Sequence, residues 1–207
     1  PYAWFPSVRS AEEIATPSAS NRMIAFPYTK YMNAVMEVDQ AAGVLMTSAQ
    51  AARALGIPEQ RWVYWCGGAE TLEECWYPSE RPDFSRCQAL REAGMGALAE
   101  AGIELGDLSH IDFYSCFPVA VEMACEMLGL DEDDPRGFTV TGGLPYAGGP
   151  GNNYSLHAVV TLAGAIADGR TENGMITGLG WFMHKHAAGI YSAEPGDASL
   201  ETHDLED

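Results

Sequence analysis

The most informative stretch of the sequence is residues 141–154, Thr141-Gly142-Gly143-Leu144-Pro145-Tyr146-Ala147-Gly148-Gly149-Pro150-Gly151-Asn152-Asn153-Tyr154. Five glycines and two prolines fall within residues 142–151, which we call the glycine loop. Glycine permits positive φ and close backbone approach while proline stiffens the chain, so the loop is predicted to present backbone N–H groups to a ligand. It lacks the Gly-Lys-Ser/Thr and Gly-x-Gly-x-x-Gly patterns of phosphate loops. The alternative is a tight crossover turn, although ordinary βα loops have only about 2 to 6 residues.

Composition limits the classes of protein that the chain can belong to. With 207 residues and 47% hydrophobic content it can bury a full core, in one domain or a domain plus an extension. A formal net charge of -18 argues against nucleic acid or an anionic membrane as partner. Five cysteines without a CxxC pair, no secretory signal and no long apolar run indicate reduced thiols in a cytoplasmic protein without membrane insertion. The apolar start without Met suggests a piece of a longer polypeptide.

The hydrophobic period alternates between 2 and 3.6, which is typical of α/β architecture. Strands are predicted at residues 42–47, 61–66, 111–114, 138–141, 175–177 and 187–191, and helices at residues 49–55, 84–101, 116–128 and 154–167. The expected order is therefore β-α-β-α-β-α-β-α-β-β. The acidic tail from Glu194 to Asp207 is expected to fray.

Two predicted loops, the glycine loop and the turn Tyr114-Ser115-Cys116-Phe117, each follow a strand at its carboxyl end. Ligands of open α/β sheets bind at that edge. The start of a helix favours negative charge and lowers the pKa of a thiol, so Cys116 is the best candidate for a reactive thiol. The alternative is that Cys116 is a small residue buried under the helix.

Three segments, in this order, resemble motifs of the thiolase superfamily. Residues 36–48 resemble the segment that ends the N-terminal half of a thiolase. The turn Tyr114 to Phe117 falls where the family has Asn-Glu-Ala-Phe, or His-Asp-Cys-Phe in the sterol-carrier-protein type. The glycine loop falls on the Gly-Gly…Gly-His-Pro motif. The chain thus resembles the C-terminal half of an acetyl-CoA acetyltransferase-like, sterol-carrier-protein-type thiolase.

The resemblance implies an α/β half-domain with a five-stranded mixed sheet and helices on both faces. It divides the chain into a lead-in (residues 1–35), the end of the N-terminal thiolase half (36–60), the C-terminal half-domain (61–192) and the acidic tail (193–207). The implied function belongs to lipid metabolism: a fragment of an acyl-CoA acyltransferase that makes or breaks a carbon-carbon bond next to a CoA thioester. A homo-oligomer, or a second subunit, is the implied partner.

The resemblance and the residues together name the candidate site. The candidate catalytic residues are Tyr114 and Cys116. The candidate substrate-binding residues are Gly143, Tyr146, Gly148, Gly149, Asn152 and Asn153. Coenzyme A thioester is expected as substrate, with no tightly bound cofactor and no metal. His184 and His186 could form a metal pair, but alternate residues on a strand usually share one face without completing a site. His157 is interpreted as a histidine on a helix face.

The sequence also departs from the family pattern. Gly149 stands in place of the base histidine, Tyr114 replaces the Asn or His that helps hold the thioester oxyanion, and Gly178-Leu179-Gly180 lacks the late cysteine. The acyl-accepting cysteine of a thiolase lies in the other half, so the chain alone is expected to be inactive in thiolysis. Two alternatives remain open. One is a retro-aldolase acting on β-hydroxyacyl-CoA with a tyrosine as proton carrier, and the other is a non-catalytic binding or assembly subunit.

Overall fold

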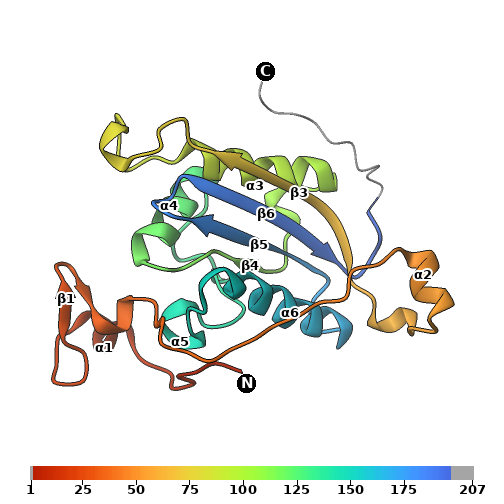
Figure 1. The fold of residues 1–207 in the computed structure, drawn as a ribbon, viewed down its shortest axis with the longest axis horizontal. Helices are drawn as coiled ribbons and strands as arrows, with labels where there is room; N and C mark the ends of the chain where they lie inside the picture. Colours follow the sequence, from red (N-terminus) through yellow and green to blue (C-terminus); the bar gives the residue numbers. More distant parts are fainter. Residues whose placement is uncertain (1, 197–207) are drawn as a thin grey trace.

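The computed structural model of the protein describes residues 2–196. Its centre is a four-stranded mixed sheet in the order β3 (Tyr64–Leu72), β6 (Lys185–Ser192), β5 (Asn173–Gly180) and β4 (Ile111–Asp112), drawn in Figure 1. β6 pairs antiparallel with both β3 and β5, whereas β4 runs parallel to β5. The carboxyl ends of β4 and β5 therefore lie at the same edge of the sheet.

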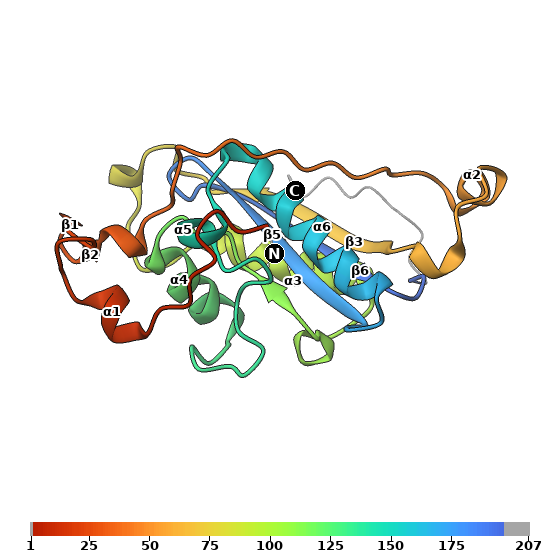
Figure 2. The same cartoon turned by 90° about the horizontal axis from the view of Figure 1, so that it is seen from below.

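Helices cover both faces of this sheet, as Figure 2 shows. α3 (Gln88–Ala101) and α4 (Pro118–Leu128) pack on one face, and α6 (Tyr154–Ala167) packs on the other. The period of two along β5 explains the arrangement, because Met175 joins the core under α3 and α4 while Ile176 joins the core under α6. The structure is a three-layer α/β sandwich.

The predicted helix ends are largely confirmed. α6 spans the predicted residues, and α4 begins at Pro118. Gly102 and Gly129, both left-handed with φ of 69° and 74°, end α3 and α4. α3 starts at Gln88 rather than near residue 84, because Asp83 holds the preceding residues in a turn through its bond to the Ser85 N–H.

The remaining elements lie at the periphery. They are α1 (Ala11–Ala15), β1 (Met23–Ala25), β2 (Tyr28–Thr29), η1 (Lys30–Met32), α2 (Ala49–Ala54), η2 (Glu59–Arg61), η3 (Pro78–Glu80), η4 (Leu105–Asp107), α5 (Leu144–Ala147) and η5 (Gly151–Asn153). The segment that contains α1, β1, β2 and η1 forms a small N-terminal lobe. Buried Asn21 holds this lobe together, since its Nδ2 lies within hydrogen-bond distance of three carbonyls around α1. Ser48 caps α2, as the sequence predicts.

The predicted five-stranded sheet is wrong. The structure has four strands in one sheet and a separate antiparallel pair, β1 and β2. Residues 42–47 are extended but pair with no strand of residues 2–196, and Leu45 and Met46 are 75% and 70% exposed. Residues 138–141 also form no strand, because the Val140 N–H donates to the side chain of Asp112 instead of a neighbouring strand.

Two further predictions concern the ends and the membrane. Most of the acidic tail predicted from Glu194 onward lies outside the described residues. Within residues 2–196, no helix combines the length and the apolar character needed to cross a bilayer.

Candidate functional site

The glycine loop and the Tyr114 to Phe117 turn meet directly, although only the turn follows a strand of the sheet, β4. The Leu144 N–H donates to Ser115 Oγ at 3.2 Å. Gly143 has φ of 79°, and a Cβ added there would lie 2.8 Å from the same Ser115 oxygen. Glycine is therefore required at position 143 both by its conformation and by the closeness of the turn.

Asp112 organises the first part of the glycine loop. This carboxylate is fully buried and accepts from the Val140 N–H at 2.8 Å and from Thr139 Oγ1 at 3.0 Å. The next two amides donate to Thr139 Oγ1, and the Gly143 N–H donates to Thr141 Oγ1 at 3.1 Å. The amides of residues 140–143 are thus all used within the protein. Any backbone donor offered to a ligand has to come from later in the loop.

Sequence reasoning missed Asp112. An acidic residue inside the short apolar run Ile111-Asp112-Phe113 was the available signal, because a buried carboxylate needs several donors.

Cys116 lies half-buried beside the start of α4. The expectation that the helix lowers its pKa is wrong, because burial raises the pKa of the thiol more than nearby backbone N–H groups lower it. Cys116 is therefore a neutral thiol near pH 7. Its carbonyl accepts from the Ala34 N–H at 3.3 Å.

Tyr114 is fixed at both ends. Its N–H donates to Thr177 Oγ1 at 3.0 Å, and its hydroxyl donates to the Gly151 carbonyl over 3.4 Å. The ring lies edge-on to Tyr154 with centroids 5.4 Å apart. Burial, and then the neighbouring Cys116, raise the pKa of the Tyr114 hydroxyl. Tyr114 therefore keeps its proton near neutral pH and serves as a hydrogen-bond donor or an acid.

An extended stretch, residues 34–42, crosses the glycine loop. The Gly149 N–H donates to the Val35 carbonyl at 2.7 Å, and the Val35 N–H donates to the Leu144 carbonyl at 3.3 Å. Farther along, Gln40 Nε2 donates to the Ala147 carbonyl at 2.8 Å. Since Ala34 also contacts Cys116, this stretch lies between Cys116 and Gly149.

The other predicted substrate-binding residues differ in their surroundings. The Tyr146 hydroxyl is buried and has no hydrogen-bond partner among residues 2–196. Asn153 pairs with the backbone of Ala42, accepting from its N–H at 3.0 Å, which is a structural role. Asn152 is exposed. Gly148 has φ of 111° and packs against Gln40.

Only His186 lies in a strand, since β6 begins at Lys185 and His184 lies in the turn before it. Among residues 2–196, neither histidine belongs to a group of three or more side chains that could hold a metal ion. His186 Nε2 lies 3.1 Å from Cys87 Sγ, and both side chains are buried. His184 packs against Trp76 with ring centroids 4.5 Å apart. Burial lowers the pKa of both imidazoles, so both are neutral near pH 7.

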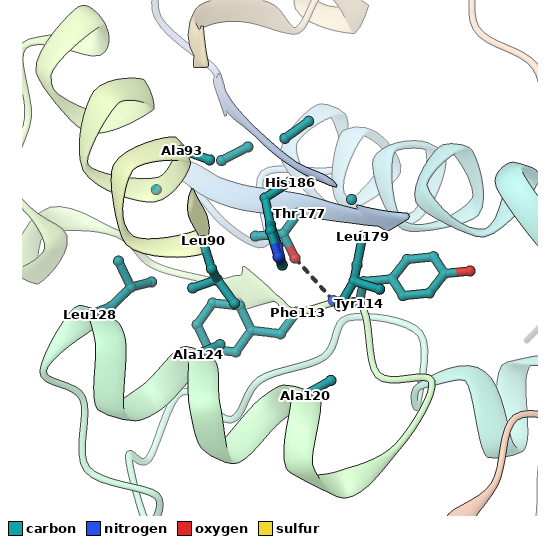
Figure 3. Close-up of a pocket in the computed structure, with 14 residues that line it drawn as sticks. Leu90, Ala93, Phe113, Tyr114, Ala120, Ala124, Leu128, Thr177, Leu179 and His186 are labelled. Carbon is teal, nitrogen blue, oxygen red and sulfur yellow. Dashed lines mark hydrogen bonds between the residues drawn. The ribbon is translucent and has the colours of Figure 1, made fainter. Parts of the chain in front are cut away.

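An apolar cavity lies between the sheet and helices α3 and α4, next to Tyr114. Figure 3 shows His186 and Thr177 on the sheet side, Leu90 on α3 and Ala120 on α4. Only a small part of its wall is polar, so the cavity suits an apolar group better than a charged one.

A comparison with solved structures gives the class of protein. The chain matches the crystal structure of a monomeric SCP2-thiolase-like protein type 1 from Mycobacterium smegmatis with 41% sequence identity and a TM-score of 0.86. The match covers 98% of this chain and 44% of that chain. No protein-family model matches this sequence, and no curated protein matches it.

The fold and the sequence identity to the solved structure together define the chain as a thiolase-like α/β protein. More particularly, the chain has the fold of an SCP2-type thiolase-like protein, the type that the three sequence motifs resemble. It spans less than half the length of the solved chain that it matches.

Proposed function

We propose that the chain is part of an acyl-CoA-handling enzyme that makes or breaks a carbon-carbon bond next to a CoA thioester. The observation that carries this proposal is the direct contact between the Tyr114 to Phe117 turn and the glycine loop, at a hydrogen bond from the Leu144 N–H to Ser115 Oγ. Two of the three motif segments that resemble thiolases are thereby in contact, which supports a shared site. The 41% identity to an SCP2-thiolase-like protein supports the same class of chemistry.

In this proposal Tyr114 donates its proton to the developing oxyanion or enolate of the substrate. Its raised pKa keeps the proton on the hydroxyl, and the bond to the Gly151 carbonyl is long enough to be exchanged for a substrate oxygen. Cys116 is the second candidate proton carrier, and substrate would have to lower its pKa or take its proton. Gly143, Tyr146, Gly148, Gly149, Asn152 and Asn153 remain the proposed substrate-binding residues. Among them Gly143, Gly149 and Asn153 act by shaping the loop, because their polar groups are used within the protein.

In retro-aldol cleavage of a β-hydroxyacyl-CoA, which needs no acyl-enzyme, the Tyr114 oxygen takes the proton of the β-hydroxyl as its own proton passes to the enolate, so the proton transfers balance without a histidine base. This reaction is the first alternative. A non-catalytic binding or assembly subunit is the second, and the internally used amides of residues 140–143 together with Gly149 at the base position favour it.

The surrounding expectations stay proposals as well. Five free cysteines fit a reducing, cytoplasmic compartment. The solved neighbour is described as monomeric, so an oligomer or a second subunit is proposed here from the exposed apolar surface of this chain alone.

The test is a substrate panel with the longer protein that contains this chain, with and without co-purifying partners. Cleavage of a β-ketoacyl-CoA by free CoA supports thiolysis, and CoA-independent cleavage of a β-hydroxyacyl-CoA supports the retro-aldolase. Tight binding of both thioesters without turnover supports the binding subunit. Absence of binding and of turnover contradicts all three.

A further inference from the structure

A small cavity of about 40 Å³ lies behind the glycine loop, against α6. Its polar lining comes from Gln40, Thr141, His157 and Thr161, and Gly148 contributes backbone. Two of these polar atoms, Gln40 Oε1 and His157 Nε2, are buried and find no hydrogen-bond partner within residues 2–196. Leaving such an atom unpaired destabilises the fold, and a cavity above roughly 15 Å³ can hold a water molecule. The cavity is therefore suited to bind water between these two side chains.

A chain of hydroxyls leads from this cavity into the interior. Thr141, which lines the cavity, has its Oγ1 2.8 Å from the Tyr154 hydroxyl. The Tyr154 hydroxyl donates in turn to Asp112 Oδ1 at 3.2 Å. Asp112 and Tyr154 are both fully buried, so the carboxyl reaches the cavity through two hydroxyls in series.

The geometry points to a proton path that runs from the Asp112 carboxyl through Tyr154 and Thr141 to water held by Gln40 and His157. A proton leaves Asp112 Oδ1 for the Tyr154 oxygen as the Tyr154 hydroxyl proton passes to Thr141 Oγ1, whose own proton passes to the water. The carboxylate and a protonated water result, and the reverse transfer restores the start. The inference does not rest on the proposed function.

The groups around Asp112 allow this carboxyl to gain and lose a proton in an ordinary pH range. Burial raises the pKa of Asp112 to about 6, although hydrogen bonds from the Val140 N–H and the Thr139 and Tyr154 hydroxyls oppose the rise. The groups that face it, from the loop residues 139–141 and from Tyr154 on α6, carry no charge near neutral pH.

Thr139 offers a competing route, because its hydroxyl also contacts Asp112 and the residue is exposed. Its Oγ1 already accepts from the amides of Thr141 and Gly142, so both lone pairs are occupied and it cannot take a further proton. Thr141 Oγ1 accepts from only one amide, that of Gly143. Thr139 Oγ1 lies 3.3 Å from it but gives its own proton to Asp112 Oδ2, so Thr141 Oγ1 keeps a lone pair for the proton of Tyr154.

Infrared spectroscopy tests the path on this chain without any substrate. At a pH below 6, protonated Asp112 gives a carboxyl C=O band that is identified by its loss in Asp112→Asn. After transfer to D₂O, the rate at which this band shifts to its deuterated position gives the rate of proton exchange. We expect exchange within the mixing time in the wild type and in the matched control Thr139→Val.

In Tyr154→Phe and in Thr141→Val, exchange should slow about tenfold or more, because it then requires local opening of the fold. If Thr141→Val loosened the loop, exchange would become faster, so slower exchange cannot result from a disturbed fold. If one of the two variants does not fold, the other is sufficient to test the path. Equal rates in all proteins, slowing only in Thr139→Val, or slow exchange in the wild type each overturn the path. A high-resolution crystal structure should show water bound to Gln40 Oε1 and His157 Nε2, and a dry cavity overturns it too.

Discussion

Asp112 shows how one buried side chain can hold a functional loop. Its carboxylate replaces a neighbouring strand as the partner of the Val140 N–H, and the Thr139 hydroxyl that donates to it accepts two further amides. A carboxylate with several donors can remain ionised while buried, but burial still raises its pKa to about 6 from 3.8. Stability should therefore depend on its protonation.

The sign of this dependence follows from the direction of the shift. Because the folded state binds the proton more tightly than the unfolded state, the contribution of Asp112 to stability is complete below about pH 4 and is lost as the pH rises to about 6. The loss should amount to roughly 3 kcal/mol. We expect the difference in unfolding free energy between the wild type and Asp112→Asn, from urea titrations, to change by this amount between pH 4 and 6.5. A difference that stays constant over that range would show that Asp112 does not titrate as described.

Cys116 illustrates the competition between a helix start and burial. The start of α4 favours a thiolate, but burial of the side chain has the larger effect and raises the pKa. At pH 7.5 the alkylation of Cys116 by iodoacetamide, followed by mass spectrometry of the peptide, should be about ten times slower than that of glutathione or slower still. Labelling faster than glutathione would mean that the thiol is activated.

The glycine loop is an element whose shape depends on two different kinds of glycine. Gly148 has φ of 111°, and a Cβ there would lie 2.3 Å from Gln40 Oε1. At Gly149 a Cβ would be tight but not blocked, since it would lie 3.3 Å from the Val35 oxygen and 3.4 Å from Ala34 Cβ, and a small shift of these neighbours would relieve it. The two neighbouring positions therefore form a matched pair for substitution.

Gly148→Ala should destabilise the protein by about 2–4 kcal/mol, through strain and the displaced Gln40 side chain. Gly149→Ala should cost about 1 kcal/mol or less, because the neighbours need to move only slightly. Thermal unfolding followed by circular dichroism measures both. Equal melting temperatures for the two variants would contradict the loop geometry.

Elements whose signals are local were predictable from the sequence. α4 and α6 follow from their periodicity and from Pro118 and Gly129 at the ends of α4. Residues 42–47 and 138–141 look like strands locally, but a strand needs a partner at the right distance, which local sequence cannot supply. The contact between the two loops matches the prediction, but its stated reason is wrong, because residues 138–141 before the glycine loop form no strand. The role of Asp112 depends on hydroxyls from two other segments, Thr139 and Tyr154, which lie 27 and 42 residues away in the sequence.

The molecule exposes several large apolar side chains, of the kind that folded proteins usually bury in a core or an interface. Trp65 on β3 is 44% exposed, and Leu45 and Met46 on the unpaired extended stretch are 75% and 70% exposed. α6 has no charged residue along its length, which is typical of a helix surrounded by protein. The segment from residue 33 to 48 runs along α6, as Figures 1 and 2 show, but leaves this surface open.

The isolated 207-residue chain should therefore self-associate. Light scattering coupled to size exclusion should give a mass above 22.3 kDa that rises with concentration. Leu45→Lys combined with Met46→Lys should reduce the association, whereas Val8→Lys, also at an exposed apolar residue but in the N-terminal lobe, should not. A strictly monomeric wild type at high concentration would show that these residues do not form an adhesive surface.

The central claim is that Tyr114 acts in carbon-carbon bond chemistry on a CoA thioester. The most direct measurement is the turnover of the proposed acyl-CoA-handling enzyme that includes this chain, on the thioester that it cleaves best, for the wild type, Tyr114→Phe, Cys116→Ala and the matched control Tyr191→Phe. We predict that Tyr114→Phe lowers kcat by about 10²-fold or more, that Cys116→Ala also lowers it, and that the control does not. Melting temperatures of both site variants should remain close to that of the wild type, since neither side chain is fully buried. Wild-type turnover in Tyr114→Phe and Cys116→Ala would contradict the account and leave only a binding role for this site.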